Sequence, residues 1–83
     1  MRIDISPNPI DDNTTIYIDS DKKDRLYIRL YDQIGRKVVD QFSKLNIGTN
    51  NILIECGKLP VGLYNVHIVT LGEVTTKTVF INR

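Results

Sequence analysis

The chain has 83 residues, a net charge of +1 from eleven basic and ten acidic side chains, and a hydrophobic share of 41%. This length holds one small core, so we expect a single domain over residues 1–83 that buries about two-thirds of the unfolded chain's surface. The net charge is close to zero and no basic face is evident, which excludes typical nucleic-acid binding. No apolar run approaches the ~20 residues of a membrane span, and a single cysteine, Cys56, excludes an internal disulfide.

The first half of the chain alternates between short apolar strands and polar turns. Ile3 and Ile5 alternate with polar neighbours, and Pro7-Asn8-Pro9 ends this strand because proline cannot join a regular ladder. Asp32-Gln33-Ile34-Gly35 has the composition of a hairpin turn, with Gly35 at its left-handed position. The strands expected in this half span residues 3–5, 14–18, 26–31 and 36–42.

The second half continues the same pattern. Residues 46–50, with a glycine at 48, are expected to form a loop, and Leu71-Gly72-Glu73 a turn. The remaining strands are expected around residues 52–54, 64–69 and 74–82.

Leu59-Pro60-Val61-Gly62-Leu63-Tyr64 is the stretch around which the chain is organised. Pro60 belongs before a strand rather than within one, and Gly62 allows a sharp change of direction. Tyr64 follows Pro60 by four residues, which resembles a tyrosine corner, in which the phenol bonds back to the backbone it has just left. An ordinary turn with a buried tyrosine is the alternative.

Seven short strands with no sustained helical period predict an all-β fold, an immunoglobulin-like antiparallel β-sandwich. A small barrel is the competing architecture.

The sequence predicts no catalytic residue, no cofactor site and no set of metal ligands. His67 is the only histidine and lies on the polar face of its strand, so we interpret it as a surface residue. Cys56 is interpreted as a small buried or half-buried residue. The acidic runs at 11–13 and 19–21, with Asp24, could offer calcium oxygens if they met at one end of the sandwich, but they match no calcium loop and are better explained as solvated turns.

Several of these residues, in their order along the chain, resemble a known family. The chain from Ile3 to Arg83 is similar to the type A C-terminal sorting domain of cargo exported by the type IX (Por) secretion system of Gram-negative bacteria. Val61, where a small residue is usual, and Thr78, before the last apolar run, depart from the pattern. The residues that carry the resemblance are Pro7, Asn8, Pro9, Gly35, Leu59, Pro60, Gly62, Tyr64, Lys77 and the terminal strand.

The resemblance implies a non-catalytic address on a larger precursor. Such a domain follows an N-terminal cargo domain, crosses to the periplasm with it by Sec export, and is read by an outer-membrane translocon. A surface sortase commonly cuts upstream of the domain, and the cargo stays on the cell surface or becomes extracellular. No signal peptide is expected within these residues, and neither a nucleic acid nor a small-molecule substrate is expected as a partner.

The terminal strand suggests how the address is recognised. Its residues are apolar on both faces, and at a sheet edge it could accept a receptor strand. The alternative is that these residues merely close the core. The expected recognition residues are Lys77, Val79, Phe80, Ile81, Asn82 and Arg83.

Two other function classes remain at this stage. A carbohydrate-binding or adhesive module would use exposed aromatic side chains, and Tyr27 and Tyr31 lie on one face of the same strand. An enzyme is the least favoured class, because the chain lacks an acid–base constellation.

Overall fold

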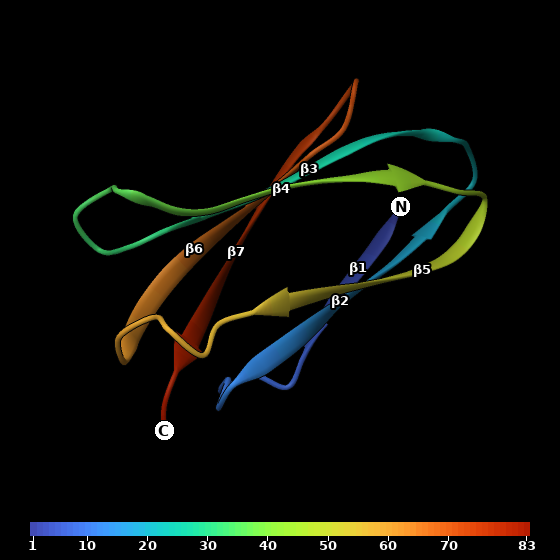
Figure 1. The fold of residues 1–83 in the computed structure, drawn as a ribbon. Coiled ribbons are helices and arrows are strands. Elements are labelled where there is room, and N and C mark those ends of the chain that lie inside the picture. The colour runs from blue at the N-terminus through green and yellow to red at the C-terminus, as the bar shows by residue number, and fades with distance from the viewer.

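Two antiparallel sheets face each other in a computed structural model that describes residues 1–83 (Figure 1). All seven regular elements are strands, which confirms the predicted all-β sandwich and sets aside the closed barrel. No helix is present that could cross a membrane. The strands are β1 (Arg2–Ser6), β2 (Asn13–Ser20), β3 (Asp24–Tyr31), β4 (Lys37–Leu45), β5 (Gly48–Glu55), β6 (Gly62–Val69) and β7 (Val74–Ile81).

The three-stranded sheet has the order β1-β2-β5, and the four-stranded sheet has the order β4-β3-β6-β7. The chain crosses between the sheets three times: from β2 to β3, from β4 to β5 and from β5 to β6. Each sheet therefore contains strands that are distant in sequence. The edge strands are β1 and β5 in the smaller sheet and β4 and β7 in the larger one.

The period-two alternation of the sequence is visible directly in the burial of the strands. On β3, Leu26, Ile28 and Leu30 are almost fully buried, while the two residues between them are only partly buried. Strand β6 buries Val66 and Ile68 in the same way. Sixteen buried side chains, nearly all aliphatic, form one core between the sheets. Burial of this aliphatic surface is the main force that holds the sandwich closed.

The expected loop over residues 46–50 is shorter than predicted, because β5 already begins at Gly48. Asn50 is buried, and its side-chain amide bonds to backbone groups of the turn that have no backbone partner. Its Nδ2 donates to the carbonyls of Asn46, Gly48 and Ile18, and its Oδ1 accepts from the Asn46 amide at 2.9 Å. One side chain thus holds the β4–β5 connection to β2.

Ile10 is a second departure from the sequence expectation. It lies between the prolines and the acidic loop, outside any predicted strand, yet it is fully buried and forms a parallel bridge with Ile81 of β7. The β1–β2 connection therefore leaves its own sheet and adds to the edge of the other.

The two flanks of the sandwich differ. On the β4/β5 flank, Nε2 of Gln41 donates to the carbonyl of Leu53 and links the two sheets at 3.2 Å. On the opposite flank, β1 and β7 line a groove, which the β1–β2 connection closes at one end only. The two chain ends lie at opposite ends of the molecule, whose longest dimension is 35 Å (Figure 1).

Candidate functional site

The C-terminal strand β7 presents two different faces. Val79 and Ile81 point into the core and are 2% and 0% exposed, whereas Phe80 is on the outer face and only partly buried. Asn82 and Arg83 follow the strand and are exposed. The predicted recognition residues thus fall into two groups: two that close the core, and others that reach the surface.

Part of the outer edge of β7 is already occupied. Ile10 donates its amide to the Phe80 carbonyl at 2.7 Å, and the Asn82 amide donates to the Ile10 carbonyl at 2.8 Å. The Phe80 amide donates to Oδ1 of Asn8 at 3.0 Å. We call residues Pro7–Ile10 the proline segment; it covers the last residues of the β7 edge.

The proline segment is itself held in place. The hydroxyl of Thr14, a buried residue on β2, donates to the Pro7 carbonyl at 3.0 Å. Pro9 has no amide hydrogen, so the chain between Asn8 and Ile10 has no donor to leave unpaired. Pro7, Asn8 and Pro9 therefore have a structural role, as expected of these motif residues. The sequence did not identify the strand involved: the segment places Asn8 and Ile10 against β7.

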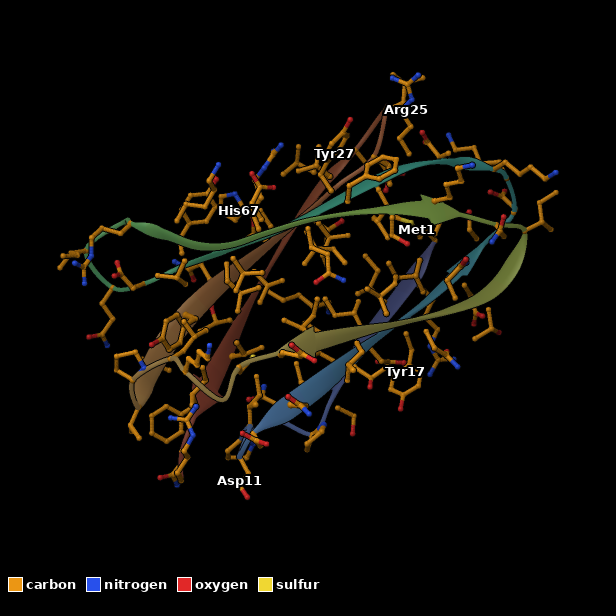
Figure 2. The ribbon with its side chains drawn as sticks, in the orientation of Figure 1. Met1, Asp11, Tyr17, Arg25, Tyr27 and His67 are labelled. Atoms are coloured by element: carbon orange, nitrogen blue, oxygen red, sulfur yellow. The ribbon has the colours of Figure 1, made fainter.

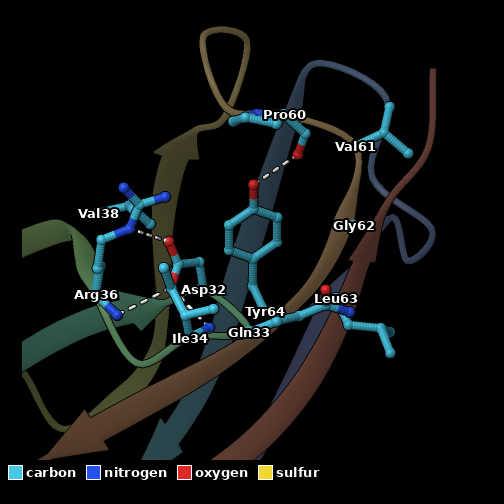
Figure 3. A pocket seen from close by; sticks show the side chains of 10 residues that line it. All are labelled: Asp32, Gln33, Ile34, Arg36, Val38, Pro60, Val61, Gly62, Leu63 and Tyr64. Carbon is cyan, nitrogen blue, oxygen red and sulfur yellow. Dashed lines mark hydrogen bonds and ion pairs between the residues drawn. The ribbon is translucent and has the colours of Figure 1, made fainter.

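The tyrosine corner predicted from the sequence is confirmed. The hydroxyl of Tyr64 donates to the Pro60 carbonyl at 2.6 Å, and the ring is 4% exposed (Figure 3). Burial raises the pKa of the Tyr64 phenol, so it stays a neutral donor over the physiological pH range. Gly62, the first residue of β6, has a φ of +157°, a conformation that residues with a β-carbon rarely adopt, as expected for it.

A shallow cavity of about 230 Å³ lies between this corner and the β3–β4 hairpin (Figure 3). Asp32 organises the hairpin: its Oδ1 accepts from the amides of Ile34 and Arg36, and its Oδ2 accepts from the Arg36 guanidinium at 2.8 Å. Partial burial alone would raise the pKa of Asp32, but these hydrogen bonds outweigh it and hold the pKa below its usual value. Gly35 has φ +86°, the left-handed conformation predicted for it. Since the oxygens of Asp32 are satisfied within the hairpin, the cavity offers no free acid.

Arg83 ties the end of the chain to the loop before β6. Its guanidinium donates to the carbonyls of Leu59 and Cys56. The Cys56 amide, in turn, donates to the Asp12 carbonyl of the β1–β2 connection at 2.9 Å. The motif residues of three separate stretches therefore meet at one end of the sandwich, the end that carries the C-terminus.

This use of Arg83 has no signal in the sequence, since a terminal arginine is ordinarily solvated. Leu59 packs against the core beside it, and its amide donates to the Cys56 carbonyl at 3.0 Å. Neither Leu59 nor Pro60 carries a reactive group.

Lys77 lies on the inner face of β7, opposite Val66, at the mouth of the groove on the open flank. Asp4 and Ile5 of β1 line the other side of this groove. Asp4 is paired with Arg2 at 3.4 Å, whereas Lys77 has no ion-pair partner. Lys77 is thus a partly buried cation at a sheet edge with its charge available to another molecule.

The remaining candidates for chemistry lie apart from one another. His67 is on the outer face of the larger sheet, with its ring 4.6 Å from that of Tyr31. Cys56 is fully buried, and burial raises the pKa of its thiol, which keeps it protonated and unreactive. No group of three His, Cys, Asp or Glu side chains is placed to hold a metal ion.

The acidic runs considered for calcium lie at opposite ends of β2. Figure 2 shows Asp11 at one end of the molecule and Arg25, next to Asp24, at the other. The eight residues of β2 separate them by roughly 25 Å. A shared calcium site is therefore wrong on geometric grounds.

Tyr27 and Tyr31 do not form a shared platform for a sugar. The Tyr27 ring packs on Phe42 at 5.3 Å and has the Arg29 guanidinium 5.1 Å from its centroid, while Tyr31 packs on His67. Figure 2 shows Tyr27 and His67 on the same outer face of the sandwich. Each tyrosine is occupied by a cross-strand partner, as expected for pairs that stabilise a sheet.

The comparison with known families agrees with this architecture. A family described as the secretion system C-terminal sorting domain matches residues 4–82. The chain belongs to this family. The sorting domain is a C-terminal signal on cargo proteins that the type IX secretion machinery handles, and it is a sorting signal rather than a catalytic domain. Cargo that carries it is secreted, toward the outer membrane or the extracellular space. A search of curated proteins finds no match.

Proposed function

We propose that residues 1–83 form a sorting domain of a larger precursor and that the outer-membrane translocon reads strand β7 of this domain. The recognition residues in this proposal are Lys77 and the segment from Val79 to Arg83. The precursor crosses to the periplasm by Sec export, and the translocon then carries it across the outer membrane. A surface sortase commonly removes the domain by cutting before it.

The observation that carries the proposal is the position of β7. It is the last strand of the chain and an edge strand, so it pairs with β6 on one side only. The unpaired side of an edge strand is a template to which another polypeptide can add a strand. The motif residues gather around the C-terminal half of this strand and fix its position.

Two other surface features are weaker candidates. The cavity beside the tyrosine corner holds an acid whose oxygens are already satisfied, and the tyrosine pairs are packed within the sheet. A role as an address, recognised by shape and backbone, is what these features support.

Export of a reporter tests the proposal. A fluorescent protein with a Sec signal peptide is fused before residue 1, and its location is followed in a bacterium with an intact type IX system and in the same strain without its translocon. We expect the reporter on the surface or in the medium of the first strain and in the periplasm of the second. Retention of the fusion in the periplasm of both strains would refute the proposed function.

Deletion of residues 79–83 then tests the terminal segment. We expect export to stop, and circular dichroism of the purified truncated domain shows whether it still folds. Because Val79 and Ile81 belong to the core, a matched variant, Asn82→Ala with Arg83→Ala, keeps both. Unchanged export of the truncated fusion would remove the terminal segment from the recognition surface.

A further inference from the structure

We propose that the part of β7 to which the export receptor adds a strand is Val74–Thr78, and that the added strand brings an acidic side chain to Lys77. This inference rests on the proposed function and names one partner, an extended strand of a receptor protein. It places the backbone contact with that strand just before Val79–Arg83, whose own outward groups are already bonded to Asn8 and Ile10. We call Val74–Thr78 the open edge.

The hydrogen-bond pattern identifies the open edge. The amide and carbonyl of Phe80 both point away from β6, because both bond to the proline segment. The β6–β7 ladder is antiparallel with no register shift, so every second residue of β7 has the same orientation. The amides and carbonyls of Val74, Thr76 and Thr78 therefore also point outward, and none of them has a hydrogen-bond partner in the structure.

The proline segment sets the limit of the open edge. The outward backbone groups of Phe80 and the Asn82 amide are already paired with Asn8 and Ile10. A receptor strand could reach them only by displacing Ile10, which is fully buried. The terminal residues are thus required to hold β7 in place, while the free backbone lies just before them.

The other edges of the sandwich are less suited to strand addition. β1 has only five residues, and its exposed side carries the Arg2–Asp4 ion pair. The β4/β5 flank is crossed by the hydrogen bond from Gln41 to Leu53. The open edge alone combines free backbone groups with a cation that has no partner.

Lys77 determines the kind of strand that fits. An inward-pointing lysine at a sheet edge opposes pairing between identical chains. An antiparallel copy centred on Thr76 would place its Lys77 diagonally across from the first Lys77, on the same inner face, where the two like charges repel. A foreign strand with Asp or Glu on its inner side would instead meet the Lys77 ammonium in the groove between β1 and β7. Charge thus favours an acidic partner strand over a second copy of this domain.

Proline substitution tests the open edge. Thr76→Pro removes an outward amide and leaves the β6–β7 ladder intact, because the lost donor faces away from β6. Thr76→Ala removes the same side chain but keeps the amide, so it is the matched control. Both are made in the exported reporter fusion, and thermal unfolding of each purified domain reports its folding. The initial export rate is measured by pulse-chase.

We expect the export rate of the Thr76→Pro fusion to fall about tenfold, which corresponds to the loss of about one backbone hydrogen bond and its neighbouring contacts. The export rate of the Thr76→Ala fusion should match that of the unsubstituted domain. Normal export of a folded Thr76→Pro domain would overturn the open edge but leave the sorting function intact. Failure of the unsubstituted fusion to be exported would instead refute the proposed function itself.

Charge reversal at Lys77 is a second test, which remains informative if Thr76→Pro destabilises the fold. Lys77→Glu is expected to slow export and Lys77→Arg to preserve it, with the unfolding temperatures of both close to that of the unsubstituted domain. Equal export of the two would overturn the acidic partner strand. A photo-crosslinking residue at position 76 should then join the reporter to an outer-membrane protein, whereas one at exposed Leu53 should not.

Discussion

Replacement of Tyr64 by phenylalanine isolates the energetic contribution of the tyrosine corner. The change removes one oxygen atom and leaves the ring in the core, so it creates no large cavity. The lost interaction is the 2.6 Å hydrogen bond to the Pro60 carbonyl. Pro60 is exposed, so water can replace the phenol at its carbonyl, and the loss should be near the ordinary net value of about 1 kcal/mol.

This loss converts into a measurable shift in melting temperature. For 83 residues the entropy of unfolding is about 0.17 kcal/mol/K, so about 1 kcal/mol lowers the melting temperature by about 6 °C. Circular dichroism during heating measures the shift, and urea titration should show a lower midpoint with an unchanged slope.

Tyr17→Phe is the matched control, because Tyr17 is 39% exposed and its hydroxyl has no partner in the structure. Its stability should change by less than about 0.5 kcal/mol. Equal effects of the two substitutions, or no effect of Tyr64→Phe, would refute the assignment of a stabilising corner.

Three further predictions concern the turns and the core. Gly35→Ala should lower the free energy of unfolding by about 1 kcal/mol, because a residue with a β-carbon is strained at φ +86°. Gly72→Ala is the control: a β-carbon meets no atom at either glycine, but Gly72 has no left-handed φ, so its urea titration should be unchanged. Ile81→Ala should lower the free energy of unfolding by about 3 kcal/mol, because the Ile81 side chain is fully buried. Val74, on the same strand, is 66% exposed, so Val74→Ala should lower it by less than about 0.5 kcal/mol. Equal effects of the two substitutions would contradict the burial assigned to β7. The pKa of Asp32 is lower in the folded protein than in the unfolded chain, where it is about 4. The ionised carboxylate therefore stabilises the fold above about pH 4, and this stabilisation is lost as the pH falls through the folded pKa. Asp32→Asn should therefore flatten the fall in melting temperature below about pH 4, and an unchanged acid slope would contradict this role.

The local structure was largely predictable from the sequence because it depends on local chemistry. Alternation gave the seven strands, with ends displaced by a few residues, and Gly35 and Tyr64 marked their turns correctly. The fold class followed from the number and length of the strands.

The pairing of the strands was not predictable, because it depends on contacts between distant residues. Nothing local indicates that β5 pairs with β2 rather than with β4, which directly precedes it. Asn50 and Ile10 were missed for the same reason: one replaces backbone partners across 32 residues, and the other pairs with a strand at the far end of the chain.

The candidate site divides in the same way. From the sequence, the last strand and Lys77 are predicted to carry recognition, and this stays a prediction. The orientation of each backbone group on β7 depends on the ladder with β6 and on the hydrogen bonds to Asn8 and Ile10. That orientation separates free backbone groups from occupied ones, and only the structure reveals it.

The opposite placement of the chain ends has a consequence for whatever protein is joined before Met1. Such a passenger begins at the pole far from Arg83, along the 35 Å axis of the sandwich (Figure 1). The passenger therefore lies away from the pole where the three motif stretches meet, whatever its size and shape. Passengers of unrelated shape are thus compatible with the same sorting domain.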